Sequence, residues 1–205
     1  MGIIAKEGGQ QRELLPAGNI HGVCYGIIDL GTQEGKFGKK HECCVLFETP
    51  SARYEDDNGD SKPRGKNKWY SVSLHEKSNM GKDLASWRGK QFTPEEKKGF
   101  DITKLLGANC LLNISHVTGG DGNVRDNISS ITPLMAGMGK LEPENAIINY
   151  SISDDGFNFD GIPEWAANKI KESEEYKNKD NPQQQSDGCP PMEDTTDYGV
   201  DDIPF

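Results

Sequence analysis

Apolar side chains recur at every second position in three stretches of the first half of the chain, which is the period of a β-strand with one buried face. The spacing predicts strands at residues 20–30, 42–49 and 69–74. We expect Pro50 to end the second strand, because proline lacks the amide hydrogen that a sheet requires. Glycines and lysines dominate residues 31–40, between the first two strands, and predict a flexible, basic hairpin loop.

Helix signals replace this alternation in the middle of the chain. Ser78 or Asn79 can cap a helix that ends at Gly89, because their side chains accept hydrogen bonds from free amides and glycine adopts the left-handed conformation at a helix end. Residues 93–96, Thr-Pro-Glu-Glu, have the sequence of a capping box. The remaining elements expected are a turn at residues 101–106, strands at 108–117 and 124–134 joined by a glycine-rich hairpin, a less regular strand at 145–150, and a helix from Pro163 to about Tyr176.

Three strands, a helical insert and a further hairpin form the element order of an OB-fold, a five-stranded Greek-key barrel that binds nucleic acid on strands 2 and 3. Mixed α+β domains of other topologies give the same order. We therefore expect a mainly β domain with a helical insert, with an OB-fold-like five-stranded Greek-key barrel and a C-terminal helix as the leading architecture. This domain is expected to span residues 18–178, between a flexible N-terminal arm at 1–17 and a disordered acidic tail at 179–205.

Negative charge is concentrated in that tail. The chain carries a net charge of −10, and residues 180–205 contain seven acidic residues and no Lys or Arg. A like-charged run with few apolar side chains is expected to be disordered. The run ends in Asp201, Asp202, Ile203, Pro204 and Phe205, an aromatic tip with a carboxylate that a pocket with a basic rim could capture.

This ending resembles the tail tip of bacterial single-stranded DNA-binding proteins, which end in aspartates followed by Ile-Pro-Phe and use that tip to recruit replication and repair proteins. The body resembles a family of phage replication-module proteins regarded as single-stranded DNA-binding OB-folds, over most of residues 18–176. That resemblance rests on residues 28–33, 86–90 with 92–93, and 162–165. Outside the tail the chain departs from the bacterial proteins, so their base-stacking positions do not carry over.

The two resemblances imply a function, a set of partners and a location. The function is sequence-independent binding and protection of single-stranded DNA during phage DNA replication, recombination or repair, in the cytoplasm of the infected bacterial host. The implied partners are single-stranded DNA and replication or repair proteins, the latter bound through the tail tip at Asp201, Asp202, Ile203, Pro204 and Phe205.

Binding single strands without reading sequence requires a cationic track for phosphates and flat aromatic faces for bases. Trp69 and Tyr70 point to opposite faces of an alternating strand, and Tyr70 shares its face with the apolar residues that follow, so Trp69 is the one expected in the groove. Alternatively, the basic stretches are solvated loops and Trp69 belongs to the core. Trp87 and Trp165 are expected in the core. The candidate single-stranded DNA-binding residues are Lys36, Phe37, Lys39, Lys40, Arg64, Lys66, Lys68, Trp69, Tyr70 and Arg125.

Other classes of function have weaker support in the sequence. The glycine-rich residues 31–36 and 136–140 lack the phosphate-loop spacing, and the five cysteines lack the spacing of a zinc site, so we expect no enzyme, no cofactor and no metal. The odd number of cysteines, five, suggests a reducing compartment. No apolar run has the length of a membrane span. Two rivals remain, a metal-dependent nuclease that uses the acidic residues 55–60, and an adaptor that binds only proteins.

Overall fold

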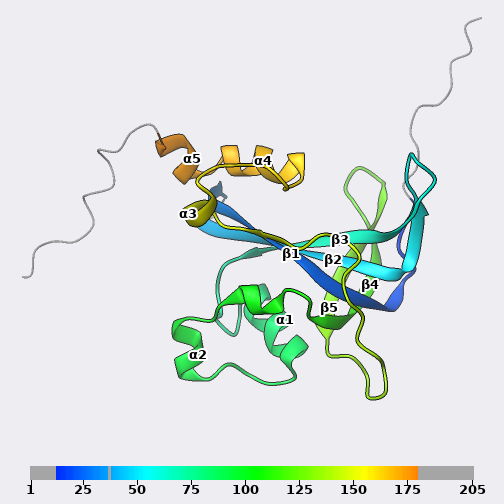
Figure 1. Cartoon of the computed structure of the whole chain (residues 1–205). Helices are drawn as coiled ribbons and strands as arrows, with labels where there is room; N and C mark the ends of the chain where they lie inside the picture. The colour runs from blue at the N-terminus through cyan, green and yellow to red at the C-terminus, as the bar shows by residue number, and fades with distance from the viewer. Residues whose placement is uncertain (1–12, 37, 180–205) are drawn as a thin grey trace, which may run out of the picture.

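The computed structural model describes residues 13–36 and 38–179, which form a largely antiparallel sheet with helices on both sides (Figure 1). The strand order is β3-β2-β1-β4-β5, and the short β6 pairs in parallel with β1. The strands are β1 (Gly18–Gly35), β2 (Gly38–Glu55), β3 (Ser61–Ser71), β4 (Asn109–Thr118), β5 (Val124–Thr132) and β6 (Ile148–Tyr150). The helices are α1 (Asn79–Arg88), α2 (Pro94–Lys98), α3 (Ile152–Asp155), α4 (Glu164–Lys171) and α5 (Glu174–Asn178), with a 3-10 turn at Ile102–Leu105.

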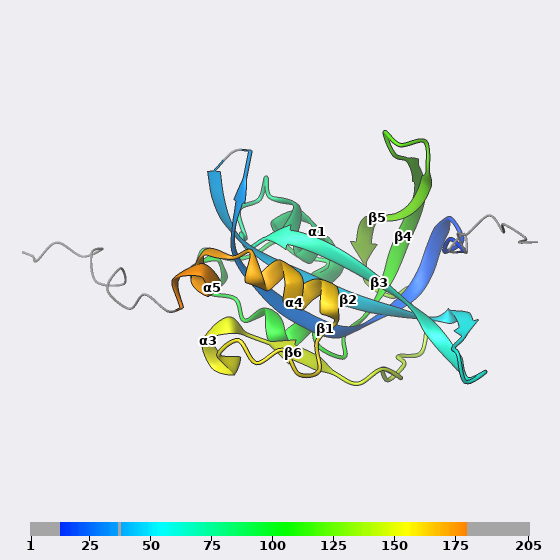
Figure 2. The same ribbon diagram turned by 90° about the horizontal axis from the view of Figure 1, so that it is seen from above.

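β1 connects the two halves of the sheet. Residues 18–23 pair with β4, and residues 23–35 pair with β2. The β1–β2 register shifts near Gly26 and again near Gly31, and irregularities of this kind bend a strand and increase its twist. Gly26 allows the close approach of β2, because a Cβ atom there would lie 2.7 Å from a leucine side chain. β4 and β5 accordingly turn away from β2 and β3 (Figure 2).

Both faces of β2 are buried, which explains its nearly continuous apolar run. Phe47 points into the larger core, which lies between the sheet and α1, while Leu46 points into a second core beneath α4. The larger core includes Leu15, Ile27, Val45, Tyr70, Leu84, Trp87, Leu112 and Ile131, and the second includes Ile28, Leu30, Cys44, Tyr150, Ala166 and Ile170. The helices therefore cover opposite faces of one sheet, α1 on one side and α4 on the other (Figure 1).

The expected helix caps are confirmed. The hydroxyl of Ser78 accepts a hydrogen bond from the amide of Gly81, and Gly89 ends α1 with a φ of 68°. The capping box of α2 is complete, with Thr93 and Glu96 each accepting a hydrogen bond from the other's amide. These signals depend on neighbouring residues alone, so the sequence was enough to place them.

Several expected boundaries in the first half are wrong. Residues 31–40 do not form a flexible loop, because β1 continues to Gly35 and β2 begins at Gly38. Pro50 does not end β2, since it falls within a register shift between Thr49 and Arg53, where no ladder hydrogen bond is required of it. β3 begins at Ser61, so the basic residues before Trp69 belong to a strand.

Two features near the ends of the expected domain also need correction. Leu15, placed by the sequence in a flexible arm, is only 2% exposed and belongs to the larger core. The expected helix at residues 163–176 is divided into α4 and α5, because the buried Ser173 caps α5 by accepting from the amide of Tyr176. The tail residues 180–205 lie outside the described residues. Within residues 13–36 and 38–179, no helix is long and apolar enough to cross a membrane.

Candidate nucleic-acid interface

Trp69 and Tyr70 lie on opposite faces of β3, as the alternation predicts. Trp69 is 42% exposed, whereas Tyr70 is buried and its hydroxyl donates to Oδ2 of Asp83 at 2.8 Å. Burial and the negative charge of Asp83 raise the pKa of Tyr70. A side chain held in this way offers no face to a base, so Tyr70 drops out of the candidate stacking residues.

The three candidate cations of β3 share the face of Tyr70 rather than that of Trp69, and each is ion-paired. Arg64 Nη2 lies 2.5 Å from Oε2 of Glu13, Lys66 Nζ 2.6 Å from Oδ1 of Asp126, and Lys68 Nζ 2.7 Å from Oδ2 of Asp83. The two lysines also donate to main-chain oxygens of β5, at 2.6 and 3.0 Å. They bridge the edges of β3 and β5, and the expected open cationic track along Arg64, Lys66 and Lys68 is not present.

Trp165 is not the core residue that the sequence predicts. It is 37% exposed and contacts Trp69, with ring centroids 5.5 Å apart and planes inclined by 33°. Helix α4 buries Ala166, Ala167 and Ile170, and this stripe leaves Trp165 at its margin. The expected burial of Trp87 is confirmed, and its indole Nε1 donates to the main-chain oxygen of Asn109 at 2.9 Å.

A groove of about 640 Å³ lies beside Trp69, between the start of β2, the end of β3 and the start of α1. It contains two exposed cations, Lys40 from β2 and Lys77 from the turn before α1, and neither has an ion-pair partner among residues 13–36 and 38–179. The exposed side chain of Val72 adds an apolar surface. Lys77 was not predicted from the sequence, although it directly precedes Ser78, the N-cap of α1.

The other candidate cations lie on two hairpins. Lys36 is exposed in the β1–β2 hairpin, while Lys39 pairs with Glu174 at 2.8 Å. Arg125, in the β4–β5 hairpin, forms an exposed pair with Asp121 at 2.5 Å. Figure 2 shows the two hairpins projecting to the same side of the molecule, with β3 between them. Phe37 lies outside the described residues.

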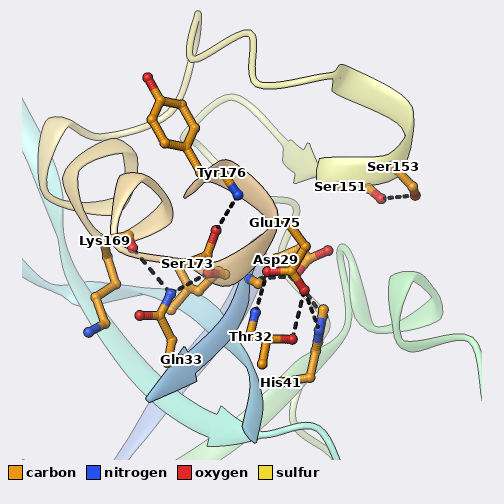
Figure 3. Close-up of polar contacts among 12 residues, drawn as sticks. Asp29, Thr32, Gln33, His41, Ser151, Ser153, Lys169, Ser173, Glu175 and Tyr176 are labelled. Atoms are coloured by element: carbon orange, nitrogen blue, oxygen red, sulfur yellow. Dashed lines mark hydrogen bonds and ion pairs between the residues drawn. The ribbon is translucent and has the colours of Figure 1, made fainter. Parts of the chain in front are cut away.

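A polar latch fastens α5 to β1 (Figure 3). The carboxylate of Glu175 accepts hydrogen bonds from the amide and the hydroxyl of Thr32, both at 2.7 Å. Gly31 has a φ of 72°, and a Cβ atom there would lie 2.7 Å from Oε2 of Glu175, so the latch requires glycine at this position. Gln33 extends it by donating to main-chain oxygens of β1 and α4.

His41 connects the latch to the groove, which it also lines. Its Nε2 lies 2.8 Å from Oδ1 of Asp29, and its Nδ1 lies 3.8 Å from Oε1 of Glu175. The hydrogen bond to Asp29 raises the pKa of His41, against the opposing effect of burial. Burial alone would raise the pKa of Asp29 and of Glu175, but hydrogen bonds from His41 and from Thr32, respectively, lower both below their ordinary values.

The latch and α4 cover the face of β1 and β2 that is opposite the larger core. The sequence predicts that nucleic acid crosses strand 2 as well as strand 3. The covering of strand 2 by α4 and the latch was not predicted. Outside this cover lie the groove at the end of β3 and a cleft of about 910 Å³ bordered by Glu13, Lys66 and the β4–β5 hairpin.

In the described part of the chain, no group of three or more His, Cys, Asp or Glu side chains is arranged to hold a metal ion. No family model matches the chain, and comparison with curated proteins and with solved structures gives no match.

Proposed function

We propose that this chain binds single-stranded DNA without sequence preference, along a path that includes the groove beside Trp69. The observation that carries the proposal is an exposed indole in a groove that also presents Lys40 and Lys77. A stacking face next to cations is the combination that single-strand binding requires, because every base has a flat face and every nucleotide a phosphate. Trp165 supports Trp69 from the side and enlarges the aromatic surface.

We also propose that the sheet is an OB-fold-like barrel. The order β3-β2-β1-β4-β5, with α1 inserted between β3 and β4, supports this architecture, since β3 and β5 are then the edges that would meet. Lys66 and Lys68 bridge those edges through main-chain oxygens of β5. In such a barrel the bound strand lies between the β1–β2 and β4–β5 hairpins, which flank β3 in Figure 2.

The proposed path sets the expected salt dependence. Lys36, Lys40 and Lys77 are exposed, and Arg125 can exchange its exposed pair with Asp121 for a phosphate. Each phosphate neutralised contributes about −0.7 to the slope of log affinity against log salt for single strands. Three or four contacts therefore predict a slope of about −2 to −3.

The acidic tail has a separate role in this proposal. The tip at Asp201, Asp202, Ile203, Pro204 and Phe205 would recruit a replication or repair protein, because an aromatic anchor with a free carboxylate suits a pocket with a basic rim. The same chain would then protect single strands during phage DNA replication or recombination and bring the partner to them.

Titration of a labelled oligothymidylate with the full chain, followed by fluorescence anisotropy, tests the proposal. Trp69→Ala should weaken binding about 5- to 150-fold, the loss expected for one stacked base. It should lower the free energy of unfolding by no more than about 0.5–1.5 kcal/mol, the value of its aromatic pair with Trp165. Tyr54→Ala is the matched control, because Tyr54 is comparably exposed but does not line the groove.

Equal affinity for duplex and single-stranded DNA would refute the proposal, as would a Trp69→Ala variant that binds like the parent. Cleavage of the oligonucleotide on addition of magnesium would favour the rival nuclease. A chain that captures replication proteins but binds neither form of DNA would favour the adaptor.

A further inference from the structure

The N-terminal segment 13–15, which we call the strap, lies across the two edges that β3 and β5 turn toward each other. Arg64 of β3 donates to the main-chain oxygen of Glu13 at 2.6 Å and to its Oε2 at 2.5 Å. The amide of Leu15 donates to Oδ2 of Asp126 in β5 at 3.1 Å. Lys66 holds the same Asp126 from β3 at 2.6 Å, so one short segment is fastened to both edges.

The two ends of the strap are held very differently. Leu15 is buried in the larger core, and its main-chain oxygen lies 2.8 Å from Nε2 of His116. The Glu13 side chain is 81% exposed, whereas the Arg64 side chain beneath it is 15% exposed. The strap thus has a fixed anchor at Leu15 and a solvent-facing carboxylate that covers Arg64.

Arg64 differs from Lys66 and Lys68 in the exposure of its carboxylate partner. Lys66 and Lys68 pair with largely buried carboxylates and also donate to main-chain oxygens of β5, and no solvent anion could take all of those positions. Arg64 also donates to main-chain oxygens, from Nη1 to Glu13 at 2.6 Å and from Nε to Arg53 at 3.2 Å, but the carboxylate that its Nη2 meets is exposed. A phosphate could take the place of that carboxylate, because a guanidinium binds both kinds of anion. Glu13 also borders the cleft of about 910 Å³ that contains Arg125.

We infer that Arg64 is a phosphate-binding site that Glu13 occupies in the free protein, and that a bound single strand displaces Glu13 while Leu15 stays anchored. This inference rests on the proposed function and extends the path from the groove beside Trp69 to the cleft at the β4–β5 hairpin. Glu13 then acts as an internal competitor that sets the affinity for DNA.

The size of the effect follows from the exposure of Glu13. Ion pairs with an exposed partner contribute little, so removing the competing carboxylate should tighten binding about two- to five-fold. The gain in affinity should shrink as salt rises, because salt screens the Arg64–Glu13 ion pair of the free protein.

The experiment is a double-mutant cycle of the full chain, in which affinity for labelled oligothymidylate is measured at low salt. Glu13→Gln should tighten binding two- to five-fold over the parent, and this gain should disappear in the Arg64→Ala background. Glu95→Gln is the matched control, because it removes the same charge from an exposed position on α2. Equal gains for Glu13→Gln and Glu95→Gln, or a gain that survives in the Arg64→Ala background, would overturn the inference and leave the proposed function standing.

A second readout applies if no variant binds DNA, in which case the proposed function fails. Titration with inorganic phosphate, followed by the NMR signal of the Arg64 Nη2 hydrogens, which face Glu13, should shift that signal in Glu13→Gln at lower phosphate concentration than in the parent. An Arg64 signal that responds identically in both proteins would refute the masking of Arg64 by Glu13. Thermal unfolding of every variant checks that the Leu15 anchor keeps the fold intact.

Discussion

The substitution Leu15→Ala distinguishes most clearly between the flexible arm that the sequence predicts at residues 1–17 and the buried side chain that the structure shows. If residues 1–17 formed a flexible arm, the substitution would change nothing. Leu15 is 2% exposed among core side chains, and Leu→Ala at such sites costs about 2–5 kcal/mol. For a chain of 205 residues, 1 kcal/mol lowers the midpoint of thermal unfolding by about 2–4 °C, so a loss of about 3 kcal/mol predicts a decrease of about 6–12 °C.

Circular dichroism during heating, with urea unfolding at fixed temperature, measures this change. Leu141→Ala is the control, because the same atoms are removed from a side chain that is exposed on the surface, and its effect should stay within about 0.5 kcal/mol. If Leu15→Ala unfolds at the same temperature as Leu141→Ala, the strap is not anchored in the core and the masking of Arg64 loses its basis.

Three further predictions concern other parts of the molecule. Trp165→Ala should cost about 0.5–1.5 kcal/mol, the value of an aromatic pair, and not the 3–5 kcal/mol of a core tryptophan; urea unfolding distinguishes the two. Because the pKa of His41 is raised by Asp29, its stabilisation is complete below the ordinary histidine value and is lost as pH rises through the raised one. The free energy of unfolding should therefore fall above about pH 6.5, and His41→Gln should remove that dependence. Deletion of Phe205 should leave affinity for single-stranded DNA nearly unchanged and abolish capture of the tail's partner from host lysate, since an anchor residue supplies most of such a contact.

The elements that could be predicted from the sequence are those decided by adjacent residues. Ser78 and the capping box at residues 93–96 satisfy amides one turn away, and alternation along β3 was enough to separate Trp69 from Tyr70. A local signal of this kind does not depend on which elements pack against the helix or strand.

The residues that could not be predicted depend on partners far along the chain. Glu48 is fully buried although it is an acid, because it accepts hydrogen bonds from the amides of Glu144 and Asn145 at 2.7 and 2.9 Å. Trp165 stays at the surface because the apolar stripe of α4 faces the second core without it. In each case the local pattern is compatible with the opposite burial, and the tertiary contact decides.

The basic residues of β3 show that the number of cations in a sequence overestimates the number that a ligand can contact. Alternation places Arg64, Lys66 and Lys68 on one face of an edge strand, opposite Trp69, where the edge of β5 offers carbonyl oxygens that need donors. Long lysine stems reach those oxygens and the carboxylates of Asp83 and Asp126 at the same time. Lysines used in this way hold the two edges together. Removing one would take the counter-charge from a largely buried carboxylate, so its loss would appear first in stability. Apart from Arg64, whose carboxylate partner is exposed, the cations left for a phosphate are those with exposed side chains and no such contacts. For this reason most of the proposed interface lies in the groove beyond Trp69 and not along the basic residues before it.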